Sequence, residues 1–238
     1  MEGQMTLIRH GKWSICYKKD NRFYKEYIYP SPQAIKREEL ASKTVWALGL
    51  NTPKFIATTF QEGKTCSLFE YCDIQSTNPT TIQNNTSFAL QIIDILDLFE
   101  KVEWDSEDMY WYQQMEDFEN ALSYVGKETH DLLIFLRKFK PTIFVHGDFT
   151  CDNIGVVSQN LIVYDFQHGA LGPKGWDKAY LASTFLPNKC GFLHLDSTEQ
   201  MMTYPISAIR YGRGLRKSSL DLVERKKQYE LWKMFLTS

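Results

Sequence analysis

The 238 residues, 43% of them hydrophobic, are enough for one medium-sized globular domain or for two closely joined lobes. The formal net charge of −2 at pH 7 gives no electrostatic case for nucleic-acid binding, so we expect no nucleic-acid partner. Because no apolar run reaches transmembrane length and the N-terminus lacks the apolar core of a signal peptide, we expect a cytoplasmic protein with no membrane partner.

The first predicted elements are two strands. Trp13–Lys18 and Arg22–Tyr29 are rich in strand-forming residues, and the intervening Lys19–Asn21 has the composition of a turn. Lys25 lies in the middle of the second strand and is our candidate for contact with an anionic ligand, in preference to the lysines beside the turn. A solvated surface lysine is the competing interpretation.

Residues 31–50 predict a helix with recognisable start, stripe and stop signals. Two adjacent acids within it, Glu38 and Glu39, are candidates to pair with Lys25 and hold it in position. Adjacent helical residues cannot both face inward, so one of the two is expected at the surface. The helix signals are Ser31 and Pro32 at the start, Leu40, Thr44 and Leu48 in the stripe, and Gly49 at the end.

Two further strands and a long helix are expected next. Phe55–Thr59 and Thr65–Glu70 read as strands, and Ile74–Asn85, rich in threonine and asparagine, reads as a linker loop. Ser87–Glu100 has the periodicity of an amphipathic helix. Its predicted apolar face contains Phe88, Ile92, Ile95 and Phe99.

An acidic and aromatic stretch follows at residues 103–119. It contains seven acidic residues and no lysine or arginine, together with Trp104, Tyr110, Trp111 and Tyr112. Such a surface can bind a cationic molecule through ion pairs and cation–π contacts. The alternative is an ordinary solvated helix face with a few packed aromatic residues.

A short hairpin is predicted further along the chain. Ile154–Val157 and Leu161–Tyr164 are strand-forming runs, and Ser158–Asn160 reads as the loop between them. The register across this three-residue loop sets Asn153 opposite Asp165, with Cβ atoms roughly 5 Å apart. A bulge in the loop would slip the register by one residue.

The most informative motifs flank this hairpin: H-G-D-F-T-C-D-N at residues 146–153 and Y-D-F-Q at residues 164–167. Phosphoryl transfer from a nucleotide requires a carboxylate that accepts the hydroxyl proton and oxygen ligands for magnesium. Asp148 suits the first role, and Asn153 and Asp165 suit the second.

Two other interpretations compete with this one. The G-D-x-x-D-N part is close to a metallophosphoesterase loop, but the upstream D-x-H and downstream G-N-H of such a site are absent. His146 by itself is explained equally well as a packed residue that braces the loop backbone.

A third motif, G-P-K-G-W-D-K-A-Y-L at residues 172–181, follows at the spacing seen in aminoglycoside phosphotransferases and their relatives. With the first two motifs it makes the chain resemble the aminoglycoside phosphotransferase and choline kinase-like family, which includes fructosamine and homoserine kinases. The resemblance is clear over residues 143–182. It implies an α+β fold of the protein-kinase-like bilobal type, ATP and Mg²⁺ as cofactors, and a small hydroxyl-bearing acceptor.

The resemblance also assigns lobes and roles. It implies a β-rich N-lobe at residues 1–70, a hinge at 71–75 and a mainly helical C-lobe at 76–238. Glu38, followed by the helix and then Pro53, matches the acid that pairs with the phosphate-binding lysine. The implied residues are Lys25 and Glu38 at the phosphates, Glu70 and Cys72 in the hinge that holds adenine through backbone groups, and Asp177 behind the catalytic loop.

Some features depart from the related protein kinases. The Arg9–Lys12 region, where a phosphate-covering loop is expected, has no G-x-G-x-x-G. Gly147 replaces the arginine of the protein-kinase catalytic loop, and Gln167 replaces the glycine of D-F-G. The segment from Phe166 to Trp176 is too short for a long activation loop. These departures disfavour a protein Ser/Thr kinase.

The C-terminal part, residues 206–235, predicts helix with a basic face. Arg210, Arg213 and Arg216 are expected at a solvated surface, with phosphate or partner contact left open for the last two. The five cysteines, Cys16, Cys66, Cys72, Cys151 and Cys190, are scattered and never in C-x-x-C. They predict reduced thiols rather than a disulfide framework or a zinc site.

The sequence thus predicts an ATP- and Mg²⁺-dependent phosphotransferase that acts on a hydroxyl of a small molecule. A cationic antibiotic, an amino alcohol and a sugar are all open as acceptors. A nucleotide-binding pseudokinase and a protein Ser/Thr kinase are the alternatives.

Overall fold

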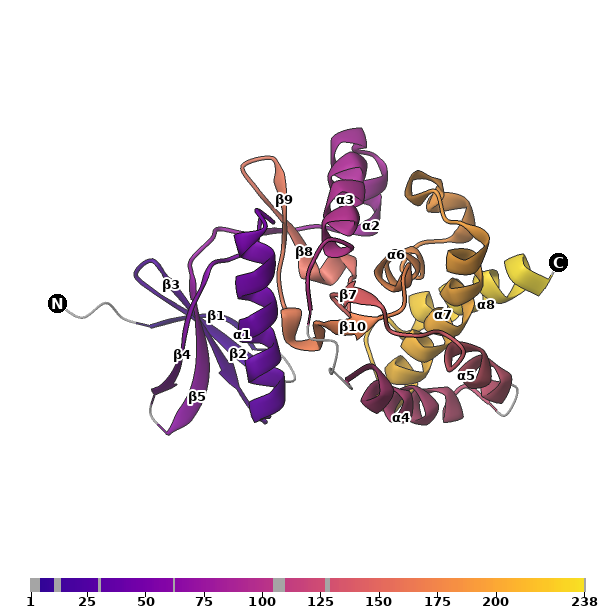
Figure 1. Cartoon of the computed structure of the whole chain (residues 1–238), viewed down its shortest axis with the longest axis horizontal. Coiled ribbons are helices and arrows are strands. Elements are labelled where there is room, and N and C mark those ends of the chain that lie inside the picture. The colour runs from indigo at the N-terminus through magenta and orange to yellow at the C-terminus, as the bar shows by residue number, and fades with distance from the viewer. Residues whose placement is uncertain are drawn as a thin grey trace. The chain divides into compact units, whose positions relative to one another are not determined.

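The computed structural model describes residues 5–10, 14–29, 31–61, 63–104, 110–126 and 129–237. The chain divides into two compact units (Figure 1). Unit 1 consists of Met1–Ser76 and Asn153–Gly169, and unit 2 consists of Thr77–Asp152 and Ala170–Ser238. Residues 153–169, which the sequence assigned to the C-lobe, therefore fold with the first unit.

A five-stranded antiparallel sheet forms most of unit 1. Its order is β1 (Thr6–His10), β2 (Ser14–Lys19), β3 (Arg22–Tyr27), β5 (Lys64–Glu70) and β4 (Phe55–Gln61). The predicted pair of strands is confirmed, since β2 and β3 form a hairpin in which Cys16 lies opposite Lys25. The second strand ends at Tyr27, two residues earlier than expected, and Gly11, Lys12 and Trp13 lie outside the described residues.

The helix of unit 1, α1 (Pro32–Ala47), packs beside β4 (Figure 1). Ser31 caps its start by accepting a hydrogen bond from the Ala34 amide, as the start signal predicted. The predicted stripe was wrong, because Leu40 and Leu48 are about half exposed. The inward face mixes the apolar Ile35 and Val45 with small and polar side chains, so apolar periodicity alone does not reveal it. Its buried residues are Ile35, Glu38, Ala41, Ser42 and Val45.

The segment predicted as a linker loop contains two short elements. The strand β6 (Gln75–Ser76) pairs with β8 (Ile154–Val157), and the helix α2 (Pro79–Gln83) follows in unit 2. The Asn78 side chain caps α2 by accepting a hydrogen bond from the Thr81 amide. Asparagine before proline is a helix-start signal, but the helix is too short to show apolar periodicity.

The hairpin of β8 and β9 (Asn160–Val163) forms with a register one residue from the prediction. Val157 pairs with Asn160, so the loop has two residues. Both of them, Ser158 and Gln159, have positive φ, at 49° and 69°. In a two-residue loop, left-handed backbone at both positions matches the right-handed twist of the two strands. The three-residue loop of the prediction would not require both residues to be left-handed.

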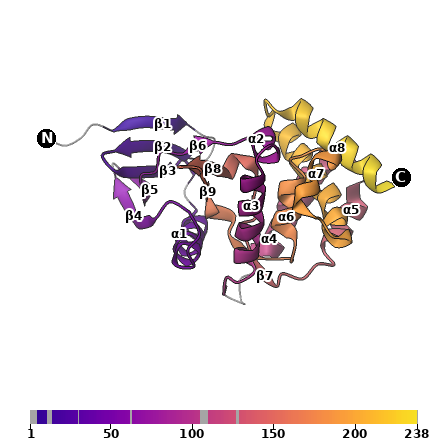
Figure 2. The same ribbon diagram turned by 90° about the horizontal axis from the view of Figure 1, so that it is seen from above.

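Unit 2 is mainly helical, and Figure 2 shows α7 and α8 lying side by side in it. Its core joins Trp111, Trp176 and Ile206. The predicted apolar face of α3 is confirmed, because its four residues are all buried. A two-stranded sheet in this unit joins β7 (Ile143–Val145) and β10 (Ala170–Gly172). The α-helices that follow α2 are α3 (Thr86–Phe99), α4 (Tyr110–Ser123), α5 (His130–Leu136), α6 (Trp176–Ala182), α7 (Ser197–Lys217) and α8 (Leu222–Thr237).

The basic C-terminal region is helical as predicted, but its arginines do not form a solvated face. Arg210 is buried and donates hydrogen bonds to the Ser183 carbonyl and the Gln228 side chain. The Arg213 guanidinium pairs with Asp117 of α4. These partners lie far away in sequence, so charge patterning along one helix does not reveal them.

Short 3₁₀ helices lie between the longer elements: η2 (Cys151–Asn153), η3 (Phe166–His168), η4 (Pro187–Lys189) and η5 (Gly191–Leu193). All five cysteines are free thiols. Among the helices of the described residues, none combines the length and the hydropathy that crossing a membrane requires.

Candidate functional site

Unit 1 contains a pocket of about 440 Å³. Its wall includes parts of the sheet, the inner face of α1 and the segments on either side of the β8–β9 hairpin. Six of the seven residues selected from the sequence line it, which are Lys25, Glu38, Glu70, Cys72, Asn153 and Asp165. The seventh, Asp148, belongs to unit 2.

Lys25 is the centre of an ion cluster in this pocket. Its Nζ donates to Glu38 Oε1 at 2.6 Å and to Asp165 Oδ1 at 2.7 Å. Burial opposes the charge of Lys25, but the carboxylates of Asp165 and Glu38 outweigh it and raise the pKa of the lysine. Lys25 is therefore a permanent cation in the wall of the pocket.

The choice between the two adjacent glutamates is also settled. Glu38 is buried and pairs with Lys25, whereas Glu39 pairs with Lys43 at 2.6 Å on the exposed side of α1. Helical geometry directs the two side chains about 100° apart, so only one can enter the pocket. The pairing with Glu38 that the family pattern implied is confirmed.

Two residues that the sequence did not single out hold Glu38 in place. The Tyr27 hydroxyl hydrogen-bonds with Glu38 Oε2 and lies 2.7 Å from Ser67 Oγ. Tyr27 is two residues beyond Lys25, on the same face of β3, and Ser67 lies opposite Lys25 on β5. Strand periodicity could have indicated Tyr27 once Lys25 was chosen, whereas Ser67 depends on the pairing of β3 with β5.

The hinge predicted from the sequence lines the same pocket. Its first amides are already paired, since Glu70 N donates to the Lys54 carbonyl at 2.9 Å and Tyr71 N donates to the Asn21 carbonyl at 3.0 Å. Lys18 Nζ lies 3.8 Å from the centre of the Tyr71 ring, so this competitor of Lys25 is directed at the hinge. The backbone beyond Tyr71, at Cys72, is therefore the part of the hinge best suited to contact a ligand.

Asn153 and Asp165 come together in unit 1 by a route different from the predicted one. In the observed register the Tyr164 amide donates to the Asn153 carbonyl at 3.1 Å, which leaves Asp165 one residue beyond direct opposition. Asp165 has a φ of 69°, and its side chain, 32% exposed, lines the pocket with that of Asn153. A carboxylate and an amide oxygen are hard donors, so this pair fits a magnesium ion.

The catalytic-loop motif lies in unit 2, where Asp177 holds its backbone. Asp177 Oδ2 accepts from the His146 amide at 2.6 Å, and Oδ1 accepts from the Gly147 amide at 3.0 Å. Burial raises the pKa of Asp177 to about 7, although both amides oppose that shift. The role behind the loop that the family resemblance implied for Asp177 is thus confirmed in its geometry.

Other contacts fix the shape of this loop. Gly147 has a φ of 81°, which favours glycine at the position where protein kinases carry arginine. His146 is fully buried, and its Nδ1 accepts from the Asp148 amide at 3.4 Å, so it braces the backbone. Burial raises the pKa of Tyr180 on α6, and the nearby charge of Asp148 raises it further, a proximity that the sequence did not predict.

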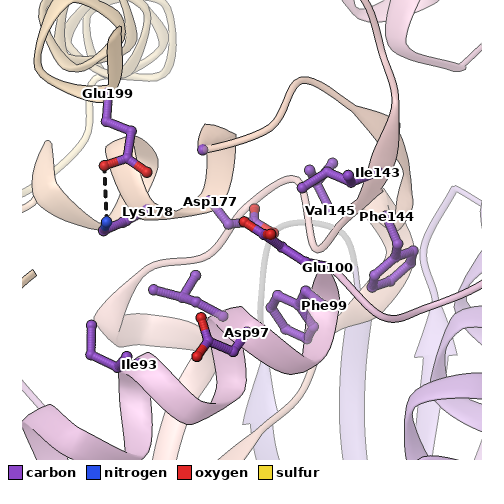
Figure 3. Close-up of a pocket in the computed structure, with 12 residues that line it drawn as sticks. Ile93, Asp97, Phe99, Glu100, Ile143, Phe144, Val145, Asp177, Lys178 and Glu199 are labelled. Carbon is purple, nitrogen blue, oxygen red and sulfur yellow. Dashed lines mark ion pairs between the residues drawn. The ribbon is translucent and has the colours of Figure 1, made fainter. Parts of the chain in front are cut away.

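Asp177 also borders a second, smaller pocket of about 80 Å³ within unit 2. Figure 3 shows its lining, with Asp97, Glu100 and Asp177 beside Phe99 and Phe144. Across it, Lys178 and Glu199 form an ion pair of 2.9 Å, drawn as a dashed line. Asp177 connects this pocket to the catalytic loop, because it accepts hydrogen bonds from the His146 and Gly147 amides.

The acidic stretch at residues 103–119 was predicted to be an anionic surface without basic partners, and the structure shows that some of its acids have such partners. Asp117 pairs with Arg213 and Arg216, and Glu119 pairs with Arg137. The aromatic residues are partly used in packing, because Trp111 is buried against Trp176 and Trp104 lies 4.9 Å from the Phe144 ring. Of the remaining acids, Asp105, Glu107 and Asp108 lie outside the described residues.

Comparison with protein-family models and with curated protein sequences gives no match. Comparison with solved structures does. A choline/ethanolamine kinase family protein from Mesorhizobium loti aligns with a TM-score of 0.72 at 12% identity, over 99% of this chain and 89% of that one. Choline kinase LicA from Streptococcus pneumoniae aligns with a TM-score of 0.71 at 15% identity, over 98% and 95%.

An aminoglycoside phosphotransferase solved with ADP and hygromycin B aligns with a TM-score of 0.68 at 10% identity, over 96% of this chain and 92% of that one. An amicoumacin kinase solved with AMP-PNP, Ca²⁺ and its antibiotic aligns with a TM-score of 0.70 at 13% identity, over 95% and 88%. The resemblance that the motifs indicated is therefore confirmed at the level of structure, and the chain has the kinase-like fold of choline kinases and aminoglycoside phosphotransferases.

Proposed function

We propose that the protein is an ATP- and Mg²⁺-dependent phosphotransferase that phosphorylates a hydroxyl group of a small molecule. The observation that carries this proposal is the buried Lys25 between Glu38 and Asp165 in the wall of the unit 1 pocket. Burial of a charged group costs desolvation free energy, and binding of phosphate is a function that explains why Lys25 is buried despite that cost. Proteins of the same fold have been solved with AMP-PNP and with ADP.

Within unit 1 each pocket residue has a role in holding the nucleotide. Lys25 contacts the α- and β-phosphates, and Glu38 keeps its ammonium group in place. The carbonyl of Glu70 and the backbone at Cys72 bind the adenine ring, since the Glu70 amide is already paired. Asn153 and Asp165 would hold magnesium, and a bound magnesium ion would neutralise part of the phosphate charge.

In unit 2, Asp148 acts as the base. Its carboxylate accepts the proton of the acceptor hydroxyl while the hydroxyl oxygen bonds to the γ-phosphorus and the bond to the β–γ bridging oxygen breaks. ADP leaves with the electron pair of that bond. The backbone bonds from His146 and Gly147 to Asp177 keep the loop in the shape that this step requires.

The acceptor class is left to experiment, and a cationic antibiotic, an amino alcohol and a sugar stay the candidates. A cationic acceptor would dock on the part of the acidic stretch around Asp105, Glu107 and Asp108, because Asp117 and Glu119 already have arginine partners. Neutralising those three acids together is then expected to raise the acceptor KM more than the ATP KM. We also propose a cytoplasmic location, where ATP is available and free thiols persist.

The test is ATP consumption measured against a panel of hydroxylated metabolites and antibiotics, with Lys25→Ala beside the wild type. We expect at least one acceptor to stimulate ADP release, and Lys25→Ala to abolish the stimulation. Lys19→Ala is the matched control on the neighbouring strand and should keep it. Magnesium-dependent nucleotide binding without transfer to any acceptor would instead identify a pseudokinase.

A further inference from the structure

Arg9 is a second cation in the wall of the unit 1 pocket, in addition to Lys25. We propose that Arg9 binds the β- and γ-phosphates of the nucleotide and does so without the glycine-rich loop that the sequence lacks. The inference deepens the proposed function and rests on it, since it adds a phosphate-binding residue to the same pocket. Arg9 lies on the edge strand β1, outside the motifs that the sequence selected.

Strand pairing places Arg9 in one row with Lys25. Cys16 of β2 lies opposite Lys25 on β3 and opposite Arg9 on β1. Figure 2 shows these three strands side by side. Side chains at directly opposed positions of neighbouring strands point to the same face of a sheet. The row therefore faces the pocket, and all three of its side chains line it.

A β-bulge in β1 directs Arg9 to this face. The register of β1 with β2 shifts by one residue just before Arg9, with Ile8 as the extra residue. In a regular register Arg9 would lie opposite Ile15, whose side chain points to the other face because it is next to Cys16 in the strand. A bulge next to a functional site commonly redirects a side chain in this way. The irregularity in β1 is thus what brings the guanidinium to the pocket.

The charges that line the pocket leave Arg9 available to an anion. Lys25 is held between two carboxylates, whereas none of the ion pairs formed within the described part of the chain involves Arg9. Arg9 is also exposed, so its guanidinium can bind a ligand without giving up an internal ion pair. A guanidinium binds phosphate oxygens through two parallel hydrogen bonds. The carboxylates whose charge a bound polyphosphate would meet are those of Glu38, Glu70, Asp73 and Asp165.

The order of the strands indicates which phosphates Arg9 contacts. The strand β5 leads into the hinge, where the proposed function places the adenine ring, and Lys25 of β3 contacts the α- and β-phosphates. From β5 the sheet continues through β3 and β2 to β1, so Arg9 lies beyond Lys25 on the side away from β5. Two strand spacings separate their backbones by about 10 Å, a gap that two long side chains can close onto one polyphosphate. Arg9 therefore contacts the end of the nucleotide that follows the α-phosphate.

The experiment measures the binding of AMP, ADP and AMP-PNP by calorimetry in the presence of magnesium. Arg9→Gln should weaken AMP-PNP binding about 10- to 100-fold, the range for lost hydrogen bonds to a charged group. It should weaken ADP binding less and leave AMP binding unchanged. Arg9→Lys keeps the charge but loses the planar fork, so its affinity for AMP-PNP should be intermediate. Lys19→Gln, which removes a positive charge from the other face of β2, is the matched control and should bind all three like the wild type.

The series of nucleotides separates a phosphate contact from a structural role and from the proposed function. An unchanged AMP-PNP affinity in Arg9→Gln, or an equal loss for AMP and AMP-PNP, would overturn the role of Arg9 and leave the proposed function intact. A loss confined to ADP and AMP-PNP, with no acceptor found in the panel, would support the role of Arg9 and count against the transfer reaction alone. A wild type that binds none of the three nucleotides would overturn both.

Discussion

The two polar clusters of the molecule hold their central groups in opposite ways. In unit 1 a cation, Lys25, lies buried between the carboxylates of Glu38 and Asp165. In unit 2 the carboxylate of Asp148 remains partly exposed, and it adds to the effect of burial in raising the pKa of the buried Tyr180. A group that only binds phosphate gains from permanent charge and rigid burial, whereas a base must stay accessible to a proton.

The two clusters also differ in how the charge of the central group is balanced. Direct ion pairs to Lys25 fix its charge state along with its position. In unit 2 the charge of Asp148 stabilises the charged forms of Arg210 and Arg213, although Arg213 makes its ion pair with Asp117. The comparison predicts that substitutions in unit 1 affect nucleotide binding and turnover together, and that substitutions in unit 2 affect turnover alone.

The largest effect is expected for Asp165→Ala. This change removes one oxygen ligand proposed for magnesium and one of the two carboxylates that hold Lys25. Magnesium-assisted ATP binding and turnover should both be lost. Calorimetry with and without magnesium measures the loss of ATP binding. An unchanged magnesium-dependent ATP affinity would show that Asp165 is not part of the magnesium site. Asp152→Ala, at an acid beside Asn153, is the control and should retain magnesium-dependent binding.

The corresponding change in unit 2 is Asp148→Asn, which is nearly isosteric. We expect kcat to fall by about 10²- to 10⁴-fold, the usual contribution of a positioned base. Nucleotide affinity and the melting temperature should stay near those of the wild type. Steady-state kinetics measures kcat and calorimetry measures nucleotide affinity on the same preparation. A parallel loss of ATP affinity would contradict the division of roles between the two units.

A smaller effect, on stability, is expected from the adjacent glutamates of α1. Glu38→Gln leaves the buried Lys25 with one carboxylate instead of two, and breaking a buried pair costs about 3–5 kcal/mol. Glu39→Gln removes an exposed pair with Lys43, which contributes about 0.3–0.5 kcal/mol. Urea unfolding of both variants measures the contrast, and equal losses would mean that the burial of Glu38 does not matter.

The smallest effect is a pH dependence in unit 2. The pKa of Asp177, about 7 in the folded protein, lies above the ordinary value of 3.8, so the folded state holds its proton more tightly than the unfolded state. The stability contributed by Asp177 is therefore complete below about pH 4 and is lost as the pH rises through 7. Unfolding of the wild type and of Asp177→Asn between pH 5 and 8 should show a free-energy difference that declines with pH. A constant difference would indicate that the carboxylate is ionised throughout.

Local sequence patterns determined a large part of the fold and of the unit 1 site. The strand-forming run placed Lys25 in the middle of β3, the helix signals placed the start of α1, and the motifs selected Asn153 and Asp165, which line the same pocket as Lys25. The strand and the start of the helix could be predicted because their signals lie in the residues that form them. The kinase-like fold followed from a resemblance over residues 143–182, which is where those patterns are densest.

Only the tertiary structure decided the remaining contacts. Ser67 reaches the Glu38 cluster because β3 pairs with β5. The register of the β8–β9 hairpin depends on a two-residue left-handed turn, which the residue types in the loop did not require. Asp117 and Arg213 are 96 residues apart, and they meet because α4 and α7 pack together. Charges that appear unbalanced along the chain are neutralised across helix interfaces, since a long arginine side chain pairs with whatever carboxylate the packing brings to it.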